Sequence, residues 1–136
     1  MHTTNYINTF IAVAEDSPAE SAVVPESKGD KKTVAQLQLE AITKAPYTLT
    51  SDDVLFGVHA ERAGIPATAR EAAREEFFSK GQPCFRASPL TKRYGWGLHS
   101  NAEGKVALYA VESPEYRALL ADESLKQLRA MRSKKA

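Results

Sequence analysis

The segment Tyr6–Ala14, which reads YINTFIAVA, places the strongest constraint on how this chain can fold. It is rich in β-branched and aromatic residues, which favour a strand. Alternate positions form two faces, with Ile7, Ile11 and Val13 on one and Tyr6, Phe10 and Ala12 on the other. Because both faces are apolar, we expect this strand to lie in a sheet that is covered on both sides.

A polar loop and a first helix follow this strand. Residues 16–32 contain two prolines and a glycine between polar side chains, so we expect a mobile connection there. A helix is predicted over 34–44, because Thr33 and Gln36 have the spacing of a capping box and apolar residues recur at helical intervals. Pro46 prevents this helix from continuing much further.

Two more helices are predicted before residue 82. One begins with Asp52 and Asp53, whose carboxylates suit the positive end of a helix, and it ends at Gly64. The other follows Thr68, which has capping-box spacing to a glutamate three residues later, and it ends near Gly81. The short connection between them predicts a compact helical hairpin.

The period of the pattern changes after residue 90. Two alternating segments, 94–100 and 105–111, flank a turn in which Gly104 can take a positive φ, so they are expected to form a β-hairpin. Ser113 and Pro114 then begin another helix, with proline at its first position.

The last segment, residues 124–136, is predicted to be a basic helix or tail. Leu125, Leu128 and Met131 recur at helical spacing, and five Lys or Arg residues surround them. Together these elements predict a single α+β domain over residues 1–136. A small antiparallel sheet, made of the N-terminal strand and the C-terminal hairpin, packs with about four helices.

Composition sets the class of protein. With 136 residues, 43% hydrophobic and 26% charged, the chain is typical of one globular, soluble domain. It has no apolar run of about 18 residues, which a membrane helix needs, and its start does not resemble a secretory signal. Cys84 is the only cysteine, so no disulfide forms within the chain, and we expect a cytoplasmic protein.

Positive charge is unevenly distributed. Two segments, 80–100 and 124–136, hold nine of the 18 Lys and Arg residues and none of the 17 acidic ones. This asymmetry favours an anionic small ligand, an acidic protein partner or, through the C-terminal tail, a nucleic acid. The alternative is that these charges form ordinary solvated surface.

The run Lys80–Ser100 also concentrates the residue types of a binding site. On a strand, Gly95, Gly97 and His99 share one face, so a ligand could approach the bare backbone while His99 provides a directional hydrogen bond. The alternative is that a neighbouring aromatic ring or helix fills the space above the glycines. The remaining candidates for binding an anionic ligand here are Arg86, Lys92, Arg93, Tyr94 and Trp96.

Cys84 and His99 are the candidates for catalysis. A Cys nucleophile needs a base nearby, which His59 or His99 would have to supply in space. The alternative is a buried, inert thiol. The three histidines show no metal-ligand spacing, and no cofactor motif is present, so neither a metal nor a cofactor is expected.

Four strings carry a resemblance that spans the whole chain, namely TSDDVLF at 50–56, EFFSKGQPC at 76–84, SPLTKRYGWGLHS at 88–100 and ALYAVES at 107–113. With them, the chain resembles an uncharacterised bacterial family of small, stand-alone cytoplasmic proteins. The resemblance implies no activity, cofactor or catalytic residue.

Three functional hypotheses follow. The first is a non-catalytic protein that binds a small anionic ligand or an acidic partner in a groove between the loop 80–93 and the strand 95–99. The second is a thiol- and histidine-dependent enzyme that uses Cys84 and His99. The third is a protein that binds nucleic acid through its basic C-terminal tail.

Overall fold

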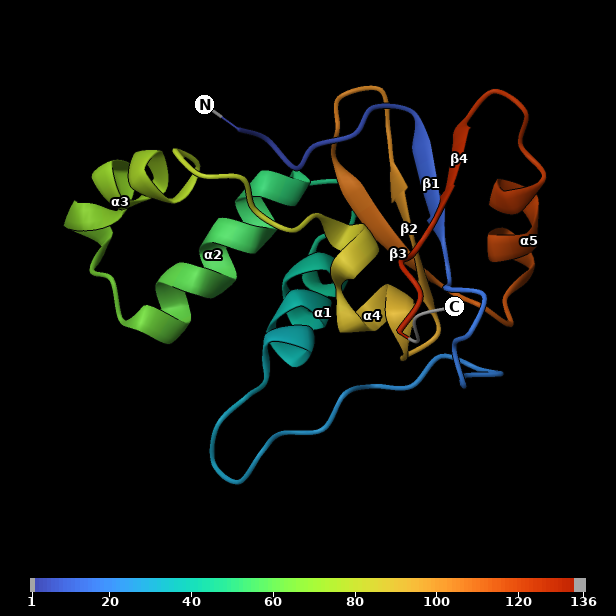
Figure 1. The fold of residues 1–136 in the computed structure, drawn as a ribbon, viewed down its shortest axis with the longest axis horizontal. Coiled ribbons are helices and arrows are strands. Elements are labelled where there is room, and N and C mark those ends of the chain that lie inside the picture. The colour runs from blue at the N-terminus through green and yellow to red at the C-terminus, as the bar shows by residue number, and fades with distance from the viewer. Residues whose placement is uncertain (1, 134–136) are drawn as a thin grey trace.

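The computed structural model describes residues 2–133 and contains a four-stranded sheet with helices on both faces (Figure 1). The strands are β1 (Thr9–Ala12), β2 (Trp96–Ser100), β3 (Val106–Ala110) and β4 (Lys126–Arg129). The helices are α1 (Val34–Lys44), α2 (Ser51–Ala63), α3 (Arg70–Phe77), α4 (Pro89–Lys92) and α5 (Pro114–Leu120), with 3-10 turns η1 (Ala67–Ala69) and η2 (Phe85–Ala87). This architecture confirms the predicted α+β class.

Strand β1 lies inside the sheet, whose order is β3-β2-β1-β4. It pairs antiparallel with β2 and parallel with β4. Phe10 and Ile11 are both 0% exposed, although they point to opposite faces. Ile11 packs in the core shared with α1 and α2, while Phe10 packs against α5. The expectation of a strand covered on both sides is confirmed for Thr9–Ala12, which is shorter than the predicted segment 6–14; Ile7 lies outside the strand and is 62% exposed.

The short connection between α1 and α2 attaches both helices to β3 at the edge of the sheet. Thr33 and Thr50 cap the two helices, and Thr50 forms a reciprocal capping box with Asp53. Between the helices, Tyr47 N–H donates to the Val106 carbonyl at 2.9 Å, and Val106 N–H donates to the Leu49 carbonyl at 2.9 Å. Strand β3 therefore fixes the point from which both helices extend.

The N-terminal segment is anchored to the start of α2. The buried Asp52 carboxylate accepts hydrogen bonds from the Thr3 hydroxyl and from both the backbone N–H and the hydroxyl of Thr4, each at 2.7 Å. In return, Asp52 N–H donates to the Asn5 side chain at 2.9 Å. These contacts satisfy both a buried carboxylate and a free helix N–H.

The predicted C-terminal helix is wrong. Within the predicted segment 124–136, residues 126–129 form β4, and residues 134–136 lie outside the described residues. Lys126 N–H donates to the Asn8 carbonyl at 2.8 Å, and Ala130 N–H donates to the Ala12 carbonyl at 2.9 Å. The backbone groups along one edge of β1 thus pair with residues 126–129 and stabilise a strand there. The spacing of apolar residues within 124–136 cannot reveal this distant pairing.

Two other local predictions need correction. Thr68 does not cap α3, which begins at Arg70 without a side-chain cap, because a 3-10 turn comes first. Helix α4 was not expected, although Ser88 and Pro89 repeat the cap-and-proline pattern that correctly predicted α5. Proline suits the first position of both helices. Helix α4 has only four residues, however, so its sequence is too short to show apolar residues at helical spacing.

Glycine at position 97 is required by the packing of α5 on the sheet. A Cβ there would lie 2.7 Å from both the Phe10 and the Tyr116 ring. The two rings already meet edge-on, with centroids 5.1 Å apart. The Tyr116 hydroxyl also accepts a hydrogen bond from Val13 N–H at 2.9 Å, so its ring has little freedom to withdraw.

We expect Gly97→Ala to destabilise the protein by about 1–3 kcal/mol, since overpacking a rigid core has costs of this size. Gly57→Ala in α2, where an added Cβ has no neighbour within 4 Å, is the matched control. It should stabilise the helix by roughly 0.5–1 kcal/mol. Urea unfolding measures both changes, and wild-type stability for Gly97→Ala would contradict the packing described.

Candidate functional site

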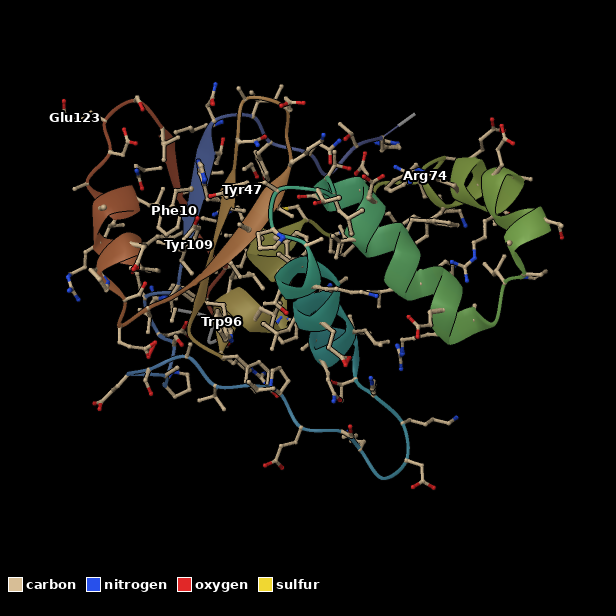
Figure 2. The ribbon with its side chains drawn as sticks, turned by 180° about the vertical axis from the view of Figure 1, so that it is seen from behind. Phe10, Tyr47, Arg74, Trp96, Tyr109 and Glu123 are labelled. Carbon is tan, nitrogen blue, oxygen red and sulfur yellow. The ribbon has the colours of Figure 1, made fainter. Side chains whose placement is uncertain are left out.

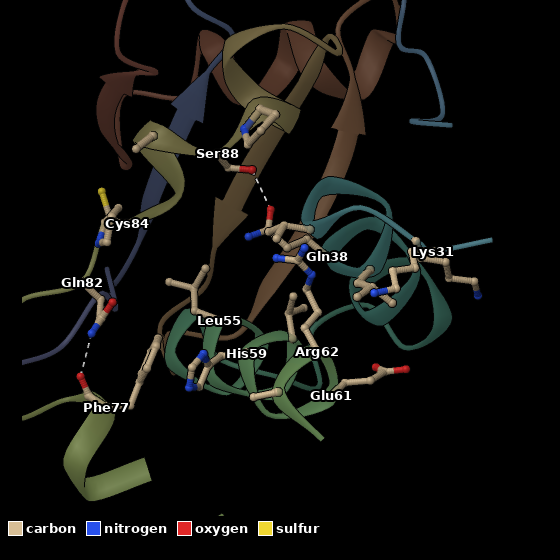
Figure 3. Close-up of a pocket in the computed structure, with 18 of the residues that line it drawn as sticks. Lys31, Gln38, Leu55, His59, Glu61, Arg62, Phe77, Gln82, Cys84 and Ser88 are labelled. Atoms are coloured by element: carbon tan, nitrogen blue, oxygen red, sulfur yellow. Dashed lines mark hydrogen bonds between the residues drawn. The ribbon is translucent and has the colours of Figure 1, made fainter. Parts of the chain in front are cut away.

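A cleft of about 870 Å³ opens between α1, α2 and the segment Phe77–Pro89 (Figure 3). Helix α1 contributes Val34, Leu37 and Gln38, and α2 contributes Leu55, Val58, His59 and Arg62. Both sets follow helical spacing, so each helix presents one face to the cleft. The volume falls within the range of small-molecule sites, which is roughly 300–1,000 Å³.

Much of the lining of the cleft is apolar. Leu55 and Val58 face it from α2, and Val34 and Leu37 face it from α1. The segment 83–89 adds two prolines and an alanine to the opposite wall. A ligand with an apolar body can therefore displace water from this surface, and each Å² of apolar area buried contributes about 25 cal/mol.

Arg62 supplies a free positive charge at the cleft. Its side chain extends from α2 toward α1 (Figure 3). Within residues 2–133, the guanidinium has no ion pair or hydrogen bond. By contrast, Lys32 at the rim is paired with Glu40 at 2.7 Å.

An aromatic pair limits the cleft on one side. The His59 ring stacks on the Phe77 ring, with centroids 4.7 Å apart and an interplanar angle of 27°. Gln82 Nε2 donates to the Phe77 carbonyl at 2.7 Å and so ties the following segment to the end of α3. This pair provides a flat wall for a ligand.

Gln38 is the most buried polar residue that lines the cleft, with 4% of its surface exposed. The Ser88 hydroxyl donates to Gln38 Oε1 at 2.7 Å (Figure 3). Sequence reasoning missed both Gln38 and Arg62. The spacing of Leu55, Val58 and Arg62 was a usable signal for one shared face, whereas nothing in the sequence indicates that a glutamine on α1 is buried.

The glycine face proposed for ligand binding is filled. Phe10 and Tyr116 occupy the space above Gly97, and the backbone of residues 21–22 lies against Gly95. A Cβ at Gly95 would lie 2.9 Å from the Ser21 carbonyl oxygen. The second of the two interpretations of this strand is therefore correct, and the groove expected between 80–93 and 95–99 is not open at the glycines.

The other predicted binding residues are dispersed. Trp96 Nε1 donates to the Val23 carbonyl at 2.9 Å, and Arg86 Nε donates to the Arg129 carbonyl at 2.7 Å. Tyr94 packs against the core formed by α1 and α4, and Arg93 is exposed. Lys92 and His99 complete the six residues that were predicted to bind a ligand. None of the six lines the cleft.

His99 belongs to a cluster of two phenols and an imidazole at the edge of the sheet. The Tyr47 hydroxyl lies 2.7 Å from His99 Nδ1 and 2.6 Å from the Tyr109 hydroxyl, and Figure 2 shows the two tyrosines near β3. Burial lowers the pKa of His99, which the Asp122 carboxylate partly opposes. Burial and the bond to Tyr109 raise the pKa of Tyr47.

Tyr47 holds a strained backbone, with φ at 58°. Residues with a side chain rarely adopt this left-handed conformation. Its hydroxyl can donate to one neighbour while it accepts from the other, so both hydrogen bonds form together. The side chain therefore offsets the strain that the backbone carries.

Cys84 and His99 are not brought together. Cys84 precedes Phe85, which packs in the core on the α1–α2 side of the sheet, whereas His99 points to the opposite face. The sulfur of Cys84 lies 3.4 Å from the Tyr6 hydroxyl. This hydrogen bond, together with burial, raises the pKa of Tyr6.

Cys84 does share the cleft with a different histidine. Both Cys84 and His59 line it, but in Figure 3 the sulfur points away from the imidazole. Within the described part of the chain, no three His, Cys, Asp or Glu side chains are grouped as they would be to hold a metal ion. None of the described helices combines the length and the apolar character needed to cross a membrane.

We expect His99 to make stability depend on pH. Because burial lowers its folded-state pKa below the ordinary value of about 6.5, the unfolded chain binds the proton more readily. The free energy of unfolding should therefore decrease as the pH falls through this value. His99→Gln should flatten that slope in urea unfolding series, with His59→Gln as the matched control. A slope unchanged by His99→Gln would contradict this assignment.

A comparison with protein families matches the whole chain. Residues 1–136 fit the model of the family of unknown function DUF6157. No curated protein and no solved structure shows detectable similarity to the chain. The expected full-length resemblance is confirmed, and the chain belongs to the DUF6157 family of unknown function.

Proposed function

We propose that this protein binds a small anionic molecule with an apolar body in the cleft between α1 and α2, without catalysing a reaction on it. The observation that carries the proposal is Arg62, an exposed guanidinium that has no partner among residues 2–133 and lies beside apolar lining residues. An ionised ligand group could pair with this guanidinium, and at an exposed arginine such a pair contributes up to about 1 kcal/mol.

The cytoplasmic location expected from the sequence is part of this proposal. Cys84 is a free thiol that lines the cleft. A reducing compartment would keep such a thiol unmodified, and it would leave the cleft available to metabolites of the cell.

Arg62→Ala should weaken binding of 4-phenylbutyrate, a probe with one carboxylate and an apolar ring, by roughly two- to fivefold, since an exposed ion pair is lost. Titrations followed in ¹H–¹⁵N NMR spectra measure the affinity and locate the site. Arg93→Ala is the matched control, because it removes an exposed guanidinium away from the cleft.

The outcome separates two possible locations. Equal affinity of the Arg62→Ala variant and the wild type would contradict a site in the cleft. A loss confined to Arg93→Ala would instead restore the loop 80–93 as the place where the anion binds.

The rival proposal is a thiol-dependent enzyme, which the presence of Cys84 and His59 in one cleft favours. Its base would be His59 rather than His99. Our proposal predicts that iodoacetamide labels Cys84 in the folded protein no faster than in the urea-unfolded chain, because the half-buried sulfur is hydrogen-bonded to Tyr6. Mass spectrometry measures the labelling rate. Faster labelling that His59→Ala abolishes would support the enzyme instead.

A further inference from the structure

Gln38 has more hydrogen-bonding capacity than the protein uses. Its side-chain amide has one acceptor oxygen and two N–H donors. The oxygen accepts from Ser88, and within residues 2–133 no group accepts from the amide nitrogen. Among the described residues, the buried side-chain atoms without a partner are Ser51 Oγ and Ser100 Oγ. The Gln38 amide nitrogen is not one of them, so it reaches the solvent-accessible surface although the residue as a whole is only 4% exposed.

Ser88 determines which way the amide faces. The Ser88 hydroxyl oxygen accepts from Leu90 N–H at 3.2 Å as the cap of α4. Its proton is then free to be donated, and Gln38 Oε1 receives it at 2.7 Å. A flipped amide would leave this buried hydroxyl proton without an acceptor, so the oxygen faces Ser88 and the nitrogen faces the other side.

That other side is the cleft. Figure 3 shows the Gln38 amide nitrogen directed into the open space bounded by Leu55 and Arg62. In the view of Figure 3 the Arg62 guanidinium lies toward the same end, and both side chains line the cleft, so it offers one neutral and one charged planar donor group. A planar acceptor that carries charge can accept from both groups.

We propose that the Gln38 amide and the Arg62 guanidinium form a carboxylate subsite, and that the ligands of this protein are amphipathic monocarboxylates. This inference rests on the proposed function and specifies its ligand class. The apolar lining takes the body of the ligand, and Ser88 positions the amide that takes one carboxylate oxygen. Gln38 is thus a binding residue, and Ser88 is a positioning residue.

The charges around the cleft favour one negative charge over two. Asp30 and Glu61 also line it, together with Lys31, Lys32 and Arg62. A doubly charged phosphate would meet both carboxylates, and Lys32 is already paired with Glu40. Since like charges raise the cost of the second ionisation, a monocarboxylate suits this surface better than a phosphate monoester.

The decisive variant is Gln38→Glu, which keeps the shape of the side chain and its acceptor for Ser88. It replaces the donors that face the cleft with a carboxylate oxygen. We expect affinity for 4-phenylbutyrate to fall at least tenfold and affinity for 4-phenylbutylamine to rise. Gln36→Glu is the matched control, because it adds the same charge to α1 at a residue that does not line the cleft. This control should leave both affinities unchanged.

A second measurement does not depend on the variant folding. In the wild-type protein, the side-chain amide resonances of Gln38 should shift when 4-phenylbutyrate is added and stay in place when 4-phenylbutylamine is added. Phenyl phosphate serves as a third probe, and it should bind more weakly than the carboxylate.

Each failure has a separate meaning. If 4-phenylbutyrate binds and depends on Arg62, but neither Gln38→Glu nor the Gln38 amide signals respond, the carboxylate subsite is wrong and the binding function stands. Tighter binding of phenyl phosphate would overturn the monocarboxylate class. If neither 4-phenylbutyrate nor phenyl phosphate binds the wild-type protein, the proposed function itself fails.

Discussion

The burial of β1 on both faces and along both edges is the constraint on which the rest of this structure depends. Phe10 and Ile11 have no exposed surface, and β2 and β4 pair with the backbone on either side. Such a strand needs a cover on each face, which divides the helices into α5 on one side and α1, α2 and α4 on the other (Figure 1). The cleft then forms on the side that has several helices.

The sequence predicted the elements that have strong local signals. Apolar residues on both faces of 6–14 indicated the doubly covered strand, and Thr33, Gly64 and Pro114 marked helix boundaries that the structure confirms. Strand β4 could not be predicted, because its partner is an edge of β1 more than a hundred residues away. Its leucine spacing fits a helix equally well, and only the tertiary pairing decides between the two.

The candidate site was harder to predict than the fold, for a physical reason. Reactive and charged residue types gather in 80–100 along the chain, yet folding uses many of them internally. Trp96 and Arg86 donate to backbone carbonyls, and Gly97 makes room for two rings. The lining of the cleft instead includes Gln38, which is buried and hydrogen-bonded to Ser88. Burial is a property of the assembled structure, and residue type alone does not reveal it.

The parallel pairing of β1 with β4 has a consequence for how the protein is made. A chain synthesised from its N-terminus exposes the apolar residues 9–12 early, but their last partner strand is complete only at residue 129. Domains fold as units during synthesis, and non-local pairings form late. Until residue 129 has been made, one edge of β1 has no strand to pair with and stays open to pairing with other chains.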